Sequence, residues 1–262
     1  MKIIDCHCHI YPQKIAEKAV KAVGDFYDIP MDCQGGTAND LLTEWKPYGV
    51  EKMLVHSTAT RPDQVAHIND FLLGVLQNHS EFIGFGTLHP DYDDNEGQIE
   101  KLLANGIKGI KFHPDFGRLD ILSPEMYHIY EMLTDKLTVM FHVGDPRYDY
   151  SHPTKIKKIL EDFPNLTVIG AHMGGYTVWE ESLDILCGKN IYFDTSSTLS
   201  FISPELAVKI IKKHGIEKIL FGTDYPMWHI KQEIENMEKL PLSDDEKEII
   251  FHENAERLLQ IK

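Results

Sequence analysis

Short apolar runs recur along the chain, and each is separated from the next by a segment with helical spacing. The runs are rich in β-branched and aromatic residues and span residues 2–5, 51–56, 82–88, 106–113, 137–142, 166–172, 190–194 and 217–222. They are apolar on both faces, as is typical of parallel strands that are buried on both sides. Eight strands alternating with helices predict an α/β fold in which the sheet closes into a (β/α)8 TIM barrel. An open doubly wound sheet shares this alternation, but no glycine-rich dinucleotide motif follows an early strand.

The segments between the runs carry helix-start signals. Several open with Ser or Asp at a cap position and Pro or Glu in the first turn, and they predict helices over 62–79, 93–105, 123–135, 153–162, 203–214 and 243–259. Residues 11–45 are too many for a simple crossover, so we expect two helices there and a loop around Gly35 and Gly36 over the active face. No linker or low-complexity stretch interrupts the chain, and residues 1–262 are expected to form a single domain with a C-terminal helix.

Composition narrows the class of function. The formal net charge of −15 disfavours nucleic acid and anionic membranes as partners, because phosphate binding needs clustered Lys and Arg. No apolar run approaches the ~20 residues that span a bilayer, and the N-terminus lacks the apolar core of a signal peptide, so a cytoplasmic location is expected. The four cysteines are too few for a disulfide scaffold and are expected to be reduced.

Polar side chains gather where the predicted strands end. His7 and His9 lie at the end of the first run, and further candidates end or closely follow later runs, namely His56, His113, His142, His172 and Asp224. The carboxyl ends of barrel strands converge on one rim, so these side chains can meet in space. Asp224 could equally cap the following helix, and each histidine taken singly could be a core residue.

The His-x-His pair at the N-terminus is the strongest single candidate for a metal site. His7 and His9 are two apart on a strand, so both should point to one face and present two imidazoles to one ion. A Cys/His zinc site that uses Cys6 and Cys8 is the rival interpretation. Strand alternation argues against it, because it places both thiols on the face opposite the histidines, as buried small hydrophobes.

Taken together, these motifs resemble the amidohydrolase superfamily, in particular the amidohydrolase-related branch that includes decarboxylases of the aminocarboxymuconate-semialdehyde type. The resemblance rests on IIDCHCHIYP, KGIKFHP, FHVG, IGAHMGG, ILFGTDYP and ENAERLL, and it extends over the whole chain. It implies one divalent ion held by His7, His9, His142 and Asp224. It also implies that His172 supports the ligands or acts in catalysis in mononuclear members, and is itself a ligand in binuclear ones. Zinc is the default ion, and Mn²⁺, Fe²⁺ and Co²⁺ also suit such a site. A homodimer or tetramer is common among such relatives.

The fourth predicted strand carries a residue that could allow a second ion to bind. Binuclear members of the superfamily carry a carboxylated lysine or a glutamate there, and this chain offers Lys111 as a candidate bridging ligand. His113, two residues later, is expected to line the substrate pocket. Arg147, Arg61 and Trp228 are further candidates for contact with a small, carboxylate-bearing substrate, since Arg binds carboxylates bidentately.

Hydrolysis is the reaction that this pattern favours first. The ion would activate water, Asp224 would take the proton and pass it to the leaving group, and His172 would stabilise developing charge while an amide or lactone bond is cleaved. Non-oxidative decarboxylation by the same residues is the alternative, and the HIYP ending of the first motif leans that way. A metal-binding protein without catalytic activity is a third interpretation.

Overall fold

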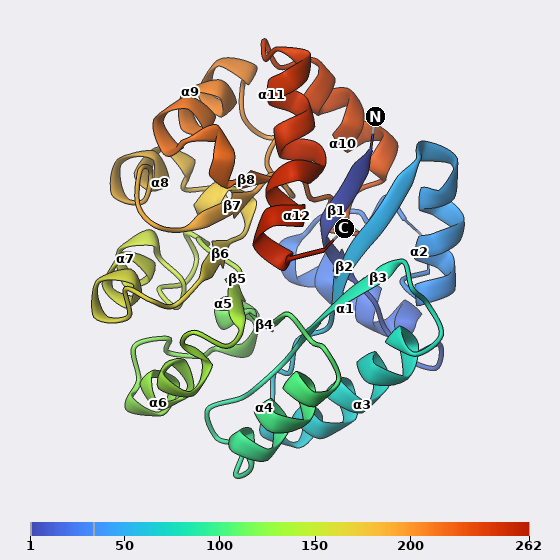
Figure 1. The fold of residues 1–262 in the computed structure, drawn as a ribbon, viewed down its shortest axis with the longest axis vertical. Coiled ribbons are helices and arrows are strands. Elements are labelled where there is room, and N and C mark those ends of the chain that lie inside the picture. The colour runs from blue at the N-terminus through green and yellow to red at the C-terminus, as the bar shows by residue number, and fades with distance from the viewer. Residues whose placement is uncertain (1, 34, 262) are drawn as a thin grey trace.

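The structure is a computed structural model, and it describes residues 2–33 and 35–261. Eight parallel strands follow one another around a sheet in sequence order, as Figure 1 shows. Each of the eight runs predicted as a strand overlaps one, and β1 extends four residues beyond its predicted end. The strands are β1 Ile3–His9, β2 Val50–His56, β3 Phe82–Gly86, β4 Gly109–Phe112, β5 Thr138–Phe141, β6 Val168–Gly170, β7 Tyr192–Asp194 and β8 Ile219–Leu220.

The sheet closes between its first and last strands. Cys6 N donates to Phe221 O at 2.9 Å, Asp224 N donates to His7 O at 2.9 Å, and His9 N donates to Tyr225 O at 2.7 Å. These bonds extend the pairing of β1 beyond the short β8, and they confirm the predicted (β/α)8 barrel. They also bring the backbone of Asp224 alongside His7.

Helices surround the barrel. They are α1 Ala16–Tyr27, α2 Ala38–Trp45, α3 Val65–Leu76, α4 Asn95–Ala104, α5 Pro114–Gly117, α6 Pro124–Leu133, α7 Pro153–Asp162, α8 Trp179–Ile185, α9 Pro204–His214, α10 Ile230–Glu238, α11 Asp244–Glu248 and α12 Asn254–Leu259. Shorter turns of 3₁₀-helix are η1 Lys46–Tyr48, η2 Pro62–Gln64, η3 His172–Gly174 and η4 Ile216–Lys218, and η5 Ile249–Glu253 is a π-helical turn. Among the described residues, no helix has the length and apolar character needed to cross a membrane.

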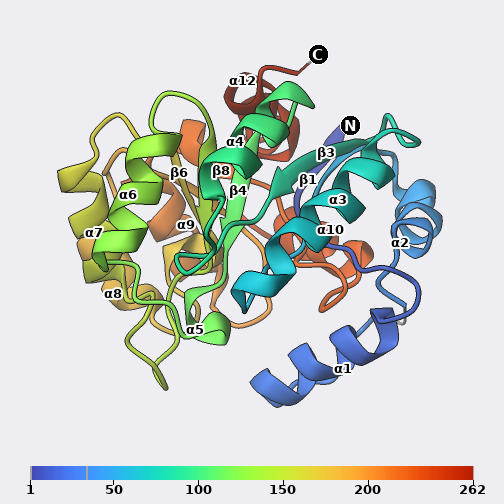
Figure 2. The ribbon, with the colours of Figure 1, turned by 90° about the horizontal axis from the view of Figure 1, so that it is seen from below.

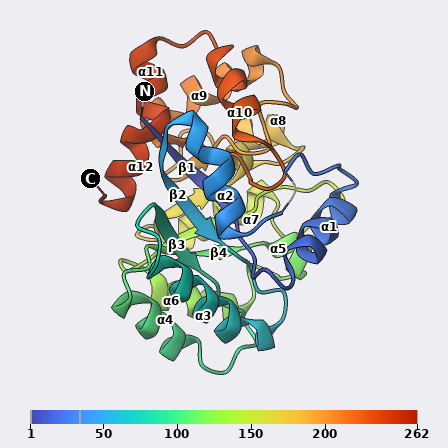
Figure 3. The same cartoon turned by 90° about the vertical axis from the view of Figure 1, so that its right-hand side faces the viewer.

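The two ends of the barrel are covered by different segments. At the end where the strands begin, Ala255 and Leu259 of α12 pack against inward-facing strand residues such as Ile4 and Met140. At the opposite end, where the strands finish, α1 lies apart from the ring of helices and on the same side as α5 (Figures 2 and 3). The segment between β1 and β2 thus holds the two predicted helices, and α1 lies over the face on which the candidate residues were expected.

Helix-start chemistry explains where the C-terminal helical run begins. Ser243 accepts a hydrogen bond from Glu246 N, and the Glu246 carboxylate accepts one from Ser243 N, which completes a capping box. From there α11, η5 and α12 continue to Leu259, as the sequence predicts. The short helices α5, α8 and α10 have no counterpart among the helices predicted from the sequence.

One prediction about β1 is wrong. Cys6 and Cys8 are both buried and free, but they do not share a face. The pairing of β1 with β2 shifts register between Asp5 and Cys8, so strict alternation is lost there. Cys6 therefore packs with inward-facing residues such as Met140, whereas Cys8 packs in the larger cluster between the sheet and the helices.

Candidate active site

The candidate site lies at the carboxyl ends of the strands, where the predicted residues converge. His7 Nε2 and His9 Nε2 lie 3.2 Å and 3.3 Å from the same carboxylate oxygen, Asp224 Oδ1. All three residues line one cavity of about 460 Å³. His7 is fully buried and Asp224 is 5% exposed. The three residues that the sequence places on β1 and after β8 are thus in direct contact.

Asp194, at the end of β7, holds His7 in a defined orientation. Its Oδ2 lies 2.8 Å from His7 Nδ1, while its Oδ1 accepts hydrogen bonds from the backbone amides of His172 at 3.0 Å and Ser196 at 3.1 Å. Because Nδ1 of His7 donates to this carboxylate, the lone pair on Nε2 faces Asp224 and His9. A carboxylate behind a metal-binding histidine commonly fixes its tautomer in this way.

The second pair of histidines follows β5 and β6. His142 Nδ1 lies 2.9 Å from His172 Nε2, and His142 Nε2 lies 2.7 Å from Gly144 O. The rings of His7 and His172 are stacked with centroids 5.2 Å apart, so the two pairs adjoin. His142 and His172 also line the cavity.

Two predicted catalytic residues occupy unusual backbone conformations. The φ angle is 60° at His172 and 66° at Asp224, in the left-handed region that side-chain-bearing residues seldom adopt. His172 N is held by Asp194 Oδ1 and Asp224 N by His7 O. Backbone strain of this kind concentrates at functional sites, where surrounding bonds maintain it.

Burial sets the protonation of the cluster. It lowers the pKa of His7 to about 4, with the nearby charge of Lys111 acting in the same direction. Burial also lowers the pKa values of His142 and His172. It would raise the pKa of Asp224, but the neighbouring imidazoles outweigh it and hold that pKa well below its usual range. His7, His142 and His172 are therefore neutral beside an anionic carboxylate, the form in which these groups bind metal.

Lys111 projects into the same cluster from β4. It is fully buried, and its Nζ lies 3.2 Å from His7 Nε2. Burial lowers the pKa of its ammonium group to about 8, although the carboxylates of Asp194 and Asp224 oppose that shift. The lysine therefore lies close enough to the pair from β1 to interact with anything they bind.

The other sequence candidates take different positions. His113 lines the cavity, with its Nε2 2.8 Å from Tyr27 OH and its ring stacked on His142. Arg61 lines the cavity and pairs with Asp63 through a largely exposed side chain.

Arg147 and Trp228 are not among the residues that line the cavity. The guanidinium of Arg147 pairs with Asp145 and donates a hydrogen bond to Phe26 O at 2.6 Å, so it secures the end of α1. Trp228 Nε1 donates to Ser197 Oγ at 2.8 Å, and that hydroxyl donates to Asp224 Oδ2 at 2.6 Å. Trp228 thus supports the carboxylate from behind.

Several residues of the site were missed by sequence reasoning. Asp194 is a carboxylate at the end of a predicted strand. Asp224 was singled out because it follows a predicted strand, and the same rule would have found Asp194. Tyr27 comes from α1, and its hydroxyl lies 2.8 Å from His113 and 3.4 Å from His142. Nothing in the local sequence signals that contact, because it depends on where α1 lies over the barrel.

The cavity above the cluster has largely apolar walls. Ala19, Ala22 and Val23 of α1 form part of one wall, and α3 contributes Ile68 and Phe71. Aromatic side chains approach closer to the histidines, namely Tyr11, Tyr27, Phe116 and Tyr176. Polar side chains of residues 57–67, such as Arg61 and Gln64, also line the cavity. A pocket with these aromatic and polar groups suits a small ring-containing ligand.

A family model described as amidohydrolase matches residues 4–261, nearly the whole sequence. The chain belongs to the amidohydrolase family. This assignment confirms the superfamily resemblance seen in the motifs. Comparison with curated protein sequences finds no match.

Solved structures of this amidohydrolase fold include both decarboxylases and hydrolases. The 5-carboxyvanillate decarboxylase of Sphingomonas paucimobilis matches with a TM-score of 0.77 and 16% identity over 100% of this chain and 99% of that one. A dihydroxybenzoic acid decarboxylase of Polaromonas, with bound manganese and 2-nitroresorcinol, matches with a TM-score of 0.77 and 16% identity over 99% and 97%. A candidate 2-pyrone-4,6-dicarboxylic acid hydrolase of Pseudomonas putida gives 0.71 and 15% over 98% and 97%. At these identities the likeness shows a common fold.

Proposed function

We propose that this amidohydrolase-family chain is a divalent-metal-dependent decarboxylase of a small aromatic or unsaturated carboxylic acid. The observation that carries the proposal is the cavity of about 460 Å³, which is lined largely by apolar and aromatic side chains and also by the His/Asp cluster. An aromatic ring can pack against Tyr27, Phe116 and Tyr176 while its carboxylate faces the cluster. The decarboxylases among the matching structures support decarboxylation as the first candidate, ahead of hydrolysis.

The residues present fit a divalent ion. His7 and His9 direct their Nε2 atoms at the same oxygen of Asp224, and the other nitrogen of His7 is held by Asp194. Two imidazoles and a carboxylate suit Zn²⁺, Mn²⁺, Fe²⁺ or Co²⁺. We assign His7, His9 and Asp224 as ligands. The family resemblance adds His142, whose two nitrogens contact His172 and Gly144 O and which would have to release one of these partners to bind the ion. A bound ion would act as a Lewis acid toward the substrate's oxygen atoms.

The chain's own residues would bind the ring and move one proton. Loss of CO₂ breaks the bond between the ring carbon and the carboxylate, and the electron pair of that bond remains on the carbon. A proton must then reach that carbon, and it comes from the solvent. We assign its relay to Asp224 and His172, which both line the cavity and which, in their anionic and neutral forms, can each accept a proton and pass it on. Ser197 holds one oxygen of Asp224 in place.

Hydrolysis of an amide or lactone is the second candidate, and Lys111 is the observation that favours it. Burial lowers the pKa of its amine to about 8, which raises the fraction of neutral amine able to combine with CO₂ and release a proton as a carbamate forms. The resulting carboxylate could bridge two ions, as in the binuclear hydrolases of the superfamily. A measured content of two ions per chain would therefore favour hydrolysis over decarboxylation.

Product analysis separates the two reactions. The protein, reconstituted with Mn²⁺ or Zn²⁺, is incubated with a panel of hydroxybenzoic and unsaturated acids and, separately, with lactones and amides. The proposal predicts CO₂ release together with one deuterium on the product ring in heavy water, and loss of both in His172→Gln. Turnover of lactones or amides without CO₂ release would overturn it in favour of hydrolysis.

A further inference from the structure

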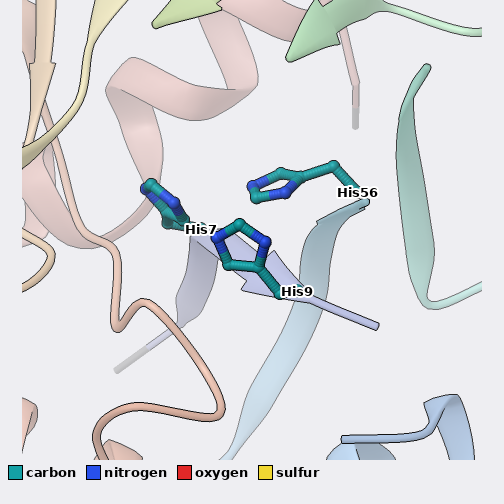
Figure 4. A group of neighbouring side chains, drawn as sticks. All are labelled: His7, His9 and His56. Atoms are coloured by element: carbon teal, nitrogen blue, oxygen red, sulfur yellow. The ribbon is translucent and has the colours of Figure 1, made fainter. Parts of the chain in front are cut away.

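His56 is a buried histidine that takes no part in the proposed reaction. It is the last residue of β2, and its backbone pairs directly with that of His9 on β1. Figure 4 shows its ring extending from β2 toward His7 and His9. Its ring centroid lies 4.4 Å from that of His9 and 4.9 Å from that of His7.

Both ring nitrogens of His56 lack a hydrogen-bond partner within residues 2–33 and 35–261. The side chain is fully buried, and a buried donor or acceptor without a partner is destabilising. Its edge-to-face contacts with the two neighbouring rings are weak interactions that do not replace a hydrogen bond. Something other than the described side chains must therefore satisfy this imidazole.

Other histidines of the cluster have polar partners for their ring nitrogens. His7 has Asp194 at Nδ1, and His142 has His172 and Gly144 O at its two nitrogens. In contrast, one nitrogen each of His7, His9 and His56 lie within 4.8 Å of one another. His56 thus combines an unused lone pair with a position beside the proposed metal ligands.

We propose that His56 is an additional ligand of the divalent ion at His7, His9 and Asp224, so that β2 contributes to the metal centre. This inference rests on the metal site of the proposed function. It makes the donor set richer in imidazole, and it therefore predicts a preference for Co²⁺ or Zn²⁺ over Mg²⁺ and Ca²⁺, which favour oxygen ligands.

Cobalt binding tests this assignment without any measurement of activity. The metal-free full-length protein is titrated with Co²⁺, and both the Kd and the visible absorption spectrum of the bound ion are recorded. The variants are His56→Ala and His56→Phe, and both remove the ring nitrogens. Ala makes the side chain smaller, whereas Phe keeps an aromatic ring in its place. His89→Ala and His89→Phe are matched controls, because His89 is also buried near a strand end but does not belong to the group of His7, His9 and His56 whose nitrogens lie close together. Thermal melting of the metal-free proteins confirms folding.

We expect both His56 variants to weaken Co²⁺ binding by about ten-fold or more and to change its absorption spectrum, because even indirect partners of a metal alter affinity by 10–100-fold. Both His89 variants should match the wild type. An unchanged Kd and spectrum in both His56 variants would overturn the assignment while leaving the metal site intact. Loss in His56→Phe alone would indicate a steric effect and would also overturn it. Absence of Co²⁺ binding by the wild type would instead overturn the proposed metal site.

Discussion

The substitution Asp194→Asn should disable His7 as a metal ligand although the two side chains have almost the same shape. Asp194 Oδ1 accepts from His172 N at 3.0 Å, from Ser196 N at 3.1 Å and from Ser196 Oγ. An asparagine must keep its oxygen at that position, because an amide nitrogen there would face three donors. Its NH₂ group would then face His7 Nδ1, which has to accept a hydrogen bond instead of donating one.

That reversal moves the proton of His7 to Nε2, the nitrogen that faces Asp224. The lone pair that would bind the ion is lost, even though the ring remains in place. Changes to such supporting carboxylates cost about 10–100-fold in metal affinity, which corresponds to about 1.4–2.7 kcal/mol. Burial would raise the pKa of Asp194, but the charge and hydrogen bond of His7 outweigh it and lower that pKa to about 2, so the native group is anionic at neutral pH.

Isothermal titration of the metal-free protein with Co²⁺ or Mn²⁺ measures this effect. Glu233→Gln is the matched control, because it also replaces a buried carboxyl by an amide but lies on α10, away from the cavity lining. We expect a Kd within about two-fold of the wild type for this control. Equal affinity of Asp194→Asn and wild type, with both folded, would refute the argument that Asp194 selects the tautomer of His7.

Three further predictions concern separate parts of the molecule. Burial raises the pKa of Glu233 to about 8, so the folded chain holds that proton more tightly than the unfolded chain does. The free energy of unfolding should therefore fall as the pH rises from about 5 to about 8, and Glu233 should contribute at most about 1.4 kcal/mol per pH unit to that fall. Urea titrations should show a smaller pH dependence in Glu233→Gln, and an unaltered pH dependence would exclude this effect of Glu233. His172→Gln should lower kcat by about 10²–10⁴-fold with metal content unchanged, and loss of the metal instead would make His172 a ligand. Arg147→Ala removes a hydrogen bond to Phe26 O and a guanidinium 4.6 Å above the Phe26 ring, so α1 should open more often. Limited proteolysis within α1 should accelerate by roughly five- to thirty-fold, as expected for about 1–2 kcal/mol, and an unchanged rate would show that other contacts hold the helix.

The barrel and most of its site could be predicted because both depend on local patterns. Each strand is a short apolar run, and barrel geometry brings the residues after the runs to one rim. This rule places His7, His9, His142, His172 and Asp224 together, and the structure brings them into one cavity. The long segment after β1 was likewise assigned two helices because of its length.

The remaining features depend on tertiary contacts or on local irregularity. The register shift in β1 separates the faces of Cys6 and Cys8, and no periodicity rule reveals a bulge of this kind. Arg147 follows a strand end as an active-site arginine would, yet its guanidinium pairs with Asp145 and contacts the end of α1. Tyr27 reaches the histidines only because α1 lies over the barrel end. Short helices such as α8 have too few turns to show a clear apolar period.

The metal content of the purified protein shows whether His7, His9 and Asp224 form a metal centre. The wild-type protein, purified without chelators or reconstituted with Mn²⁺, Zn²⁺ or Co²⁺, would be analysed for bound metal beside His9→Ala and Asp224→Asn. We expect about one ion per wild-type chain, retained through gel filtration, and loss of most of it in both variants. A folded wild-type protein that binds no ion after reconstitution, or variants that keep the full amount, would contradict the assignment of His7, His9 and Asp224 as a metal centre.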